Sequence, residues 1–212
     1  MLRVGLTGGI AAGKSTVAAR LVADGARLID YDLLAHQVLA PGGQAVEAVV
    51  GRFGRQVLAA DGSVDRPLLA ALVFGGARAN RARADLDAIV HPAVYRQAAR
   101  LEEEWSDRPL VVVHDVPLLA QVGGHIPFSF DRVLDVEAPA DVRIARMVNA
   151  RHMTRDQAVG RIRSQASEED RRRLADIVID GSLPIEQMFD SVDRIYRGLA
   201  SEAEETDRHC EA

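Results

Sequence analysis

Near its beginning the chain reads Gly8-Gly9-Ile10-Ala11-Ala12-Gly13-Lys14-Ser15-Thr16. This stretch fits the pattern G-x-x-x-x-G-K-S/T of a phosphate-binding loop, whose glycines let successive backbone N–H groups turn inward around an anion. The apolar run Leu2–Thr7 before the loop predicts a strand, and the helical pattern from Lys14 to Asp24 predicts a helix after it. Because a helix N-terminus also attracts anions, these features together predict a site for nucleotide phosphates.

Lys14 is the single lysine of the chain, since the other 25 of its 26 lysine and arginine residues are arginines. A compact, mobile ammonium suits a tight backbone loop better than a planar guanidinium does. We therefore expect Lys14 to reach the β- and γ-phosphates of ATP and Ser15 to offer its hydroxyl to Mg²⁺. The residues expected to contact the phosphates are Ala11, Ala12, Gly13, Lys14, Ser15 and Thr16.

The composition is that of a soluble globular protein, with 48% hydrophobic and 27% charged residues among 212. The net charge of −5 gives the surface no general attraction for nucleic acid or an anionic membrane, and no apolar run approaches the length of a membrane span. The single cysteine, Cys210, cannot form an internal disulfide, and no basic-then-apolar leader opens the chain. We expect a cytoplasmic protein.

Strand and helix patterns alternate along much of the chain. Runs such as Leu110-Val111-Val112-Val113 lack a polar alternation, as strands covered on both faces do. The alternation predicts an α/β fold with a doubly wound, mostly parallel five-stranded sheet of the type found in phosphate-loop NTPases. The expected strands are Leu2–Thr7, Ala26–Asp30, Leu110–Asp115, Arg132–Val136 and Asp176–Ile179.

We expect one domain over residues 1–200, with two special regions inside it. Residues 33–105 contain no clear strand and predict a helical insertion that holds the second substrate, with breaks at Pro41-Gly42-Gly43, Asp61-Gly62-Ser63, Gly75-Gly76 and His91-Pro92. Residues 139–175 are helical and arginine-rich, as in a lid that closes over phosphates. Residues 201–212 are acidic and polar, and we expect this tail to be disordered.

Acidic residues follow two of the predicted strands. Asp30 and Asp32 follow the second strand, and ligands of such sheets bind at the carboxyl ends of the strands. Asp32 either caps the helix that begins at Leu33 or accepts the proton of an attacking hydroxyl, and the nearby phosphate loop favours the second role. Asp115, after the third strand, is expected to hold Mg²⁺ through water.

Arginines crowd the predicted lid. Arg143 and Arg146 lie three residues apart and so share a helical face, and Arg146 is expected to stabilise the charge of the transferring phosphoryl group. The run Arg171-Arg172-Arg173 is interpreted as solvated surface. His91 has no second ligand at metal-binding spacing, so we expect a structural histidine and no zinc site.

Several motifs in order resemble the dephospho-CoA kinase family over about residues 1–195. The loop alone would indicate only a superfamily, whereas the ordered set is specific. The motifs are Leu6-Thr7-Gly8-Gly9-Ile10, Ile29-Asp30-Tyr31-Asp32, Asp61-Gly62-Ser63-Val64-Asp65-Arg66, Ile89-Val90-His91-Pro92, Asp115-Val116-Pro117-Leu118-Leu119, Ser164-Gln165-Ala166 and Ala175-Asp176-Ile177-Val178-Ile179-Asp180.

The resemblance implies ATP-dependent phosphorylation of the ribose 3′-hydroxyl of dephospho-CoA, the last step of coenzyme A synthesis. It implies that Asp32 is the base, that Arg146 lies in the lid, and that the acceptor contacts Arg66, His91, Pro117 and Leu118. The chain departs from the family pattern at Ala11 and Ala12, where Gly and Ser are common, and we expect little effect because both are small. Further departures are Gln121 for Glu, His152 for Asp and Gly181 for Asn.

Other functions share parts of this pattern. A nucleoside monophosphate kinase would share the fold, loop and lid, but the Asp-Tyr-Asp and Val-Pro-Leu-Leu segments argue against it. A GTP-dependent switch would need an Asn-Lys-x-Asp motif, for which no second lysine exists. A nucleotide-sensing regulator without turnover is disfavoured by the intact set of Lys14, Ser15 and Asp32.

Overall fold

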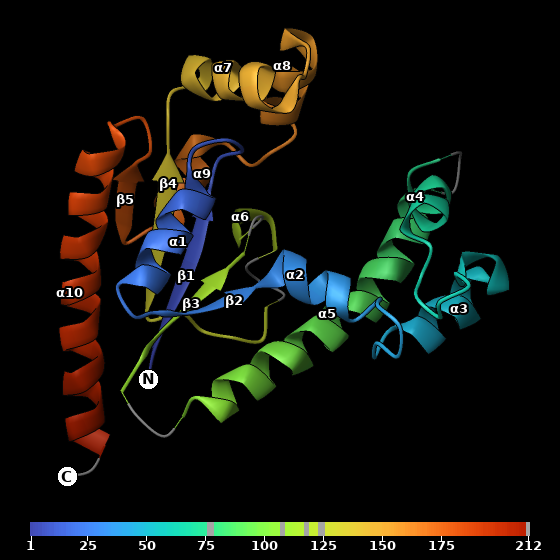
Figure 1. Ribbon diagram of the computed structural model, residues 1–212, viewed down its shortest axis with the longest axis horizontal. Coiled ribbons are helices and arrows are strands. Elements are labelled where there is room, and N and C mark those ends of the chain that lie inside the picture. Colours follow the sequence, from blue (N-terminus) through green and yellow to red (C-terminus); the bar gives the residue numbers. More distant parts are fainter. Residues whose placement is uncertain (76–78, 107–108, 117–118, 123–125, 211–212) are drawn as a thin grey trace. The chain divides into compact units, whose positions relative to one another are not determined.

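The computed structural model describes residues 1–75, 79–106, 109–116, 119–122 and 126–210 (Figure 1). The chain divides into two compact units, and each is described by itself. The first unit comprises Met1–Asp30 and Glu104–Ala212, and the second comprises Tyr31–Glu103. The second unit nearly coincides with the helical insertion expected over residues 33–105.

The first unit is built on a five-stranded sheet with the strand order β2-β3-β1-β4-β5. All four strand pairings are parallel, which confirms the predicted doubly wound α/β fold. The strands match the expected runs to within a residue or so at either end. They are β1 (Leu2–Gly8), β2 (Arg27–Asp30), β3 (Val111–Asp115), β4 (Arg132–Glu137) and β5 (Ile177–Asp180).

Helices cover both faces of this sheet (Figure 1). On one face α1 (Lys14–Ala23) and α10 (Ile185–Cys210) enclose the main apolar core, to which β1 contributes Leu2, Val4 and Leu6. Gly5 points the other way, since a Cβ built there would meet Phe130 and Leu119, the first residue of α6 (Leu119–Val122). The remaining helices of this unit are α7 (Ala140–Arg151), α8 (Arg155–Arg163) and α9 (Glu168–Leu174).

The C-terminal segment corrects one expectation. Residues from 201 were expected to be disordered, but α10 continues to Cys210. Ala203 is buried in the core, and the Glu202 carboxylate accepts an ion pair from Arg132 at 2.8 Å. The acidic composition suggested disorder because it does not reveal the apolar contact of Ala203. Burial of one helical face can stabilise a helix that is polar on its other faces.

The second unit is helical, with a single isolated bridge between Leu58 and Val64 among its described residues. Its long helix α5 passes through Pro92, so the break expected at His91-Pro92 is wrong. Proline removes one helical hydrogen bond, but Val90, Ala93 and Val94 are buried around it and hold the helix together. The elements are α2 (Tyr31–Gln37), α3 (Val46–Phe53), η1 (Arg55–Val57), α4 (Arg66–Phe74) and α5 (Ala79–Glu104).

None of the helices in the described part of the chain combines the length and the apolar character that crossing a bilayer requires.

Candidate functional site

The phosphate-binding loop joins β1 to α1 at the carboxyl end of the sheet. Gly13 has a φ of 117° and precedes Lys14, the first residue of α1, so the helix N-terminus opens onto the loop. Ala11 has a φ of 60°, in the left-handed region that glycine adopts more readily. Ala11 thus holds a conformation that glycine would adopt with less strain, and the expectation that the alanine has little effect stays a prediction.

Arg146 of α7 holds this loop from its carbonyl side. Its Nη1 donates to the carbonyl oxygens of Ala11 and Ala12 at 3.1 and 3.0 Å, and its Nη2 donates to the carbonyl oxygen of Gly181 at 2.7 Å. One guanidinium thus satisfies three backbone acceptors of the loop and of the segment that follows β5. The predicted contact of Arg146 with the γ-phosphate stays a prediction.

Two further residues fix the loop. The side-chain oxygen of Gln165 accepts a hydrogen bond from the Ile10 amide at 2.8 Å. Gly181 packs directly on the loop, since a Cβ built there would lie 1.9 Å from the carbonyl oxygen of Ala12. At the spacing found in this chain, position 181 has no room for a side chain unless the loop shifts.

Lys14 and Asp115 form an ion pair across the end of the sheet. Asp115 ends β3 and is the register partner of Asp30, which ends β2. The Ser15 side chain is exposed in the first turn of α1. Hydroxyl and carboxylate oxygens at one edge of the sheet suit Mg²⁺, which takes few protein ligands and completes its shell with water and substrate phosphates. Among the residues that the structure describes, no group of three or more His, Cys, Asp or Glu side chains is placed to hold a metal ion.

A buried polar cluster lies on β4, α7 and α9 behind the loop. It consists of Asp135, Glu137, Arg143 and Arg171, each at most 5% exposed. The Arg171 guanidinium donates to Glu137 at 2.5 Å and to the Ala166 carbonyl oxygen at 2.5 Å. The interpretation of Arg171 as solvated surface is therefore wrong, whereas Arg172 and Arg173 are exposed.

Burial shifts the pKa values of two groups in this cluster toward their neutral forms. Burial, the largest cause, and the negative charge of Glu137 together raise the pKa of the Asp135 carboxyl to about 7, against the opposing effect of Arg171. Burial likewise lowers the pKa of the Arg143 guanidinium. Arg143 lies against the loop, because a Cβ built on Gly9 would meet its Nη1 at 2.0 Å.

The predicted acceptor-side residues lie mainly in the second unit. Asp32 is exposed in the first turn of α2, and no capping hydrogen bond from it accompanies that helix among the described residues. Arg66 is the exposed first residue of α4, and His91 of α5 is half-exposed with its Nε2 3.9 Å from Asp87 Oδ1. Pro117 and Leu118 lie outside the described residues.

Three contacts at or behind the phosphate loop were not predicted from the sequence, namely those of Gln165, Arg171 and Gly181. All three residues act on, or lie behind, a loop more than 125 positions earlier in the chain, and no local pattern links segments so far apart. The only sequence signal was that Ser164-Gln165-Ala166 and the segment around Asp180 belong to the family motifs.

Comparison with known proteins gives a consistent result. The family model described as dephospho-CoA kinase matches residues 2–187. A dephospho-CoA kinase of Bifidobacterium longum is 54% identical over 198 residues, which cover 93% of this chain and 96% of that protein. A dephospho-CoA kinase of Streptomyces avermitilis is 44% identical over 203 residues, covering 96% of each.

Solved structures agree in fold. The crystal structure of TT1252 from Thermus thermophilus is 30% identical, covers 93% of this chain and 97% of its own, and has a TM-score of 0.73. A dephospho-CoA kinase from Campylobacter jejuni is 19% identical with a TM-score of 0.64, covers 93% of this chain and 96% of its own, and supports the fold alone.

Substitution of Ala11 and of Ala12 by glycine should change the free energy of unfolding in opposite directions. Ala11→Gly removes the left-handed strain and should raise the free energy of unfolding by roughly 0.5–1 kcal/mol. Ala12→Gly should lower it by about 1 kcal/mol or more, because Ala12 is fully buried and glycine adds freedom to the unfolded chain. Urea unfolding followed by the fluorescence of Trp105, the single tryptophan, measures both in the first unit. Equal losses in both variants would show that Ala11 is unstrained.

The Asp135 carboxyl should make stability depend on pH. Its pKa is raised from 3.8 to about 7 on folding, so the folded state holds a proton that the unfolded state releases between these values. The contribution of Asp135 is therefore favourable at low pH and is lost as pH rises toward 7. The Asp135→Asn variant lacks this titrating group, so its stability does not fall in this way. The difference in free energy of unfolding between the variant and the wild type should therefore increase in favour of the variant as pH rises, by about 1 kcal/mol per pH unit at most.

Urea unfolding at pH 5, 6, 7 and 8 tests this difference, with Asp131→Asn as an exposed control. A constant difference between Asp135→Asn and wild type across the range would contradict the raised pKa.

Proposed function

Because the chain belongs to the dephospho-CoA kinase family, we propose that it transfers the γ-phosphoryl group of ATP to the ribose 3′-hydroxyl of dephospho-CoA, giving coenzyme A and ADP. The observation that carries this proposal is the match of the family model over residues 2–187, joined to a formed phosphate loop at the carboxyl end of the sheet. The single cysteine further supports a reducing cytoplasm as its compartment.

The loop amides, the N-terminus of α1 and Lys14 are proposed to bind the β- and γ-phosphates, with contacts along residues 11–16. In this structure Lys14 pairs with Asp115, so its ammonium is already held at the site before a phosphate arrives. Mg²⁺ would be held by Ser15, with Asp115 acting through water, and when bound it supplies positive charge to the β- and γ-phosphate oxygens.

Asp32 is proposed as the general base. Its carboxylate would accept the proton of the 3′-hydroxyl as that oxygen bonds to the γ-phosphorus and the bond to the bridging oxygen of ADP breaks. Two features support the role: Asp32 is exposed, and it stands two residues after Asp30, which ends β2 beside Asp115. Arg66, His91, Pro117 and Leu118 are proposed to contact the acceptor.

Arg146 is proposed to serve the reaction through the loop. Its three hydrogen bonds to backbone carbonyls fix the shape on which the phosphate contacts depend. Any contribution of Arg146 to the charge of the transferring phosphoryl group would add to this positioning role.

The proposed activity can be tested by comparing acceptor substrates. Purified protein incubated with MgATP should convert dephospho-CoA to coenzyme A and produce one ADP for each, as followed by chromatography. AMP, CMP, UMP and shikimate serve as control acceptors and should give ADP no faster than water does. Phosphorylation of a nucleoside monophosphate in preference to dephospho-CoA would overturn the proposal.

Asp32→Asn should lower kcat by about 100-fold or more, because the amide keeps the shape of the side chain but accepts no proton. The affinity for ATP should change less than about twofold, since no phosphate contact is proposed for Asp32. Calorimetric titration with ATP and steady-state kinetics separate the two effects. Lys14→Ala is the contrasting variant and should lower both affinity and kcat; undiminished turnover by Asp32→Asn would refute the base assignment.

A further inference from the structure

Three aromatic side chains of the second unit form a row across two helices. Tyr31 is the first residue of α2, and Tyr95 and His91 lie on α5. The ring centroids of Tyr31 and Tyr95 are 6.2 Å apart in an edge-on arrangement, and those of Tyr95 and His91 are 6.0 Å apart and tilted. Aromatic rings at such separations attract one another. We call these three residues the aromatic row.

The row connects two residues that are proposed to act on the acceptor. His91 forms one end of the row. Asp32, the proposed base, directly follows Tyr31 at the other end and lies in the first turn of α2. Because Tyr95 contacts both Tyr31 and His91, it links the helix that carries the base to the helix that carries the histidine.

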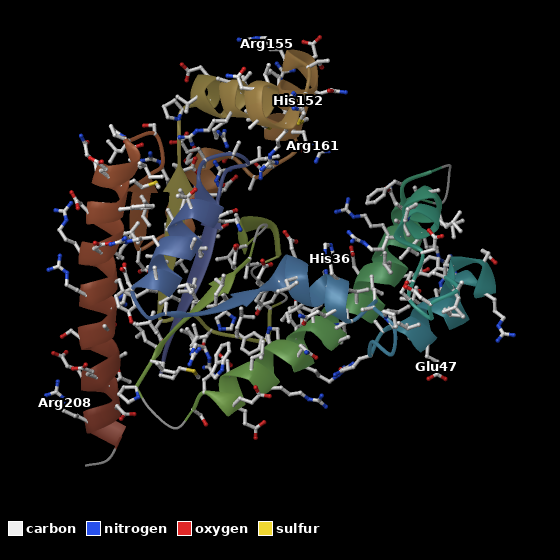
Figure 2. All side chains as sticks on the ribbon, viewed as in Figure 1. His36, Glu47, His152, Arg155, Arg161 and Arg208 are labelled. Atoms are coloured by element: carbon white, nitrogen blue, oxygen red, sulfur yellow. The ribbon has the colours of Figure 1, made fainter. Side chains whose placement is uncertain are left out.

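The position of Asp32 depends on how α2 is packed. This helix has only seven residues, and helices so short are held in place by tertiary contacts. Tyr31 and Leu34 are its buried side chains, whereas Asp32 is exposed. His36, labelled in Figure 2, is also exposed, one helical turn after Asp32. The contact of Tyr31 with Tyr95 therefore lies on the buried side of α2 and helps to determine where the exposed carboxylate lies.

The His91 imidazole has a neighbour on each side along α5. Asp87 lies one turn earlier, with its Oδ1 3.9 Å from His91 Nε2, and Tyr95 lies one turn later. The His91 side chain is nevertheless 45% exposed, so it remains accessible to a substrate. A smaller side chain at position 95 would remove one of the two neighbours and allow the imidazole to adopt other rotamers.

The two tyrosines contribute ring contacts and no charge. Burial raises the pKa of the Tyr31 hydroxyl far above its usual value, and Tyr95 and Glu102 act in the same direction. Burial also raises the pKa of the Tyr95 hydroxyl. Both groups therefore stay protonated at neutral pH and do not compete with Asp32 for a proton.

We propose that Tyr95 is a positioning residue for phosphoryl transfer, because it holds α2 against α5 and thereby sets the Asp32 carboxylate relative to His91. The inference rests on the proposed function for the roles of Asp32 and His91. Tyr95 acts through these two residues and is assigned no contact with the reacting atoms. Its ring is the part that matters, so phenylalanine should replace it.

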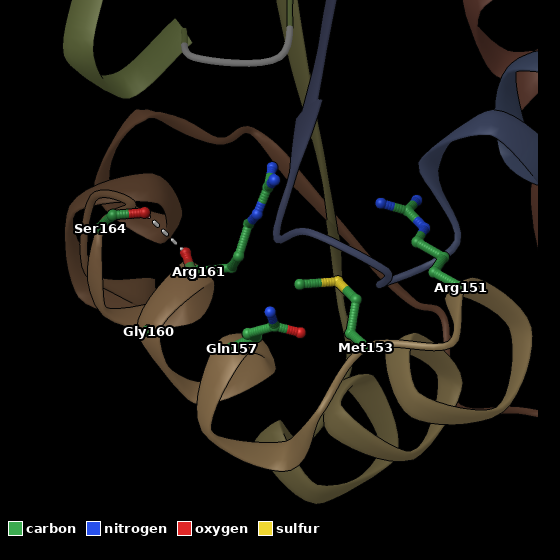
Figure 3. A pocket seen from close by; sticks show the side chains of 6 residues that line it. All are labelled: Arg151, Met153, Gln157, Gly160, Arg161 and Ser164. Atoms are coloured by element: carbon green, nitrogen blue, oxygen red, sulfur yellow. Dashed lines mark hydrogen bonds between the residues drawn. The ribbon is translucent and has the colours of Figure 1, made fainter. Parts of the chain in front are cut away.

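The nucleotide side of the proposed site is built from other residues. The phosphate loop and the hairpin of α7 and α8 belong to the first unit, whereas the whole row belongs to the second. A pocket in this hairpin, drawn in Figure 3, is lined by residues between Arg151 and Ser164 and by none of the row. A change at Tyr95 should therefore affect the acceptor and the transfer step while leaving ATP binding intact.

Steady-state kinetics and calorimetric titration of the full chain test the proposal. Tyr95→Leu should lower kcat by about 10-fold to 100-fold, because a base displaced by about 1 Å loses its alignment with the hydroxyl. It should also weaken the binding of dephospho-CoA measured without ATP, whereas the affinity for ATP should change less than about twofold. Tyr95→Phe should keep kcat and both affinities near those of the wild type.

A matched control separates positioning from a general loss of stability. Val94, the buried neighbour of Tyr95 on α5, is no part of the row. Val94→Ala should lower the temperature of unfolding but leave kcat within about twofold of the wild type when assayed well below that temperature. A loss of kcat in Val94→Ala as large as that in Tyr95→Leu would overturn the proposal.

A double-mutant cycle shows whether Tyr95 acts through the base. In the Asp32→Asn background, Tyr95→Leu should lower kcat by less than about twofold, because the group that it positions is already lost. The same fold loss in both backgrounds would exclude this coupling and sink the assignment. If the wild type does not phosphorylate dephospho-CoA, the proposed function fails; if it does and Tyr95→Leu turns over equally fast, only the positioning role fails.

Discussion

A loop that binds phosphate through backbone amides depends on one constraint, namely that its carbonyl oxygens find partners elsewhere. Buried carbonyls without donors would cost free energy. The Gly9 carbonyl oxygen accepts from the Ala12 amide within the loop at 3.0 Å, whereas those of Ala11 and Ala12 take their donor from another segment. In this protein the Arg146 guanidinium meets the constraint by donating to Ala11, Ala12 and Gly181. The segments that supply these contacts are α7 and the end of β5, so the site requires the carboxyl half of the chain to be folded.

What the sequence predicted well was local. The strands and the loop with its following helix each carry a pattern within a few residues, and the structure confirms them. The contacts of Arg146 with Ala11 and of Gln165 with Ile10 span 135 and 155 positions, and such pairings depend on the packing of whole elements. Local composition also misled where packing outweighed it. Pro92 continues a helix because buried neighbours hold it, and Ala203 anchors a segment whose acidic character suggested disorder.

The run Arg171-Arg172-Arg173 shows why composition alone cannot separate surface from interior. Successive residues on a helix point about 100° apart, so one of three adjacent arginines can face inward while the others face solvent. Arg171 does so and meets Glu137, with Asp135 3.9 Å away. A buried carboxylate without such a cation would be strongly disfavoured. The acidic residues of β4 thus determine which arginine is buried, and this relation is visible only once β4 and α9 are packed together.

The near absence of lysine gives the cationic side chains of this chain distinct tasks. A guanidinium is planar, always charged and rich in donors, so Arg146 can hold three carbonyls at once and Arg171 can bond a carboxylate and a carbonyl together. The single ammonium of Lys14 is compact and rotates freely, which suits a partner that changes during the reaction. Its partner in the structure is the Asp115 carboxylate at the end of β3, and the triphosphate of the proposed function would offer more negative charge than one carboxylate does. Exchange of that partner requires no rearrangement of the arginine contacts, so the loop can keep its shape while its ligand changes.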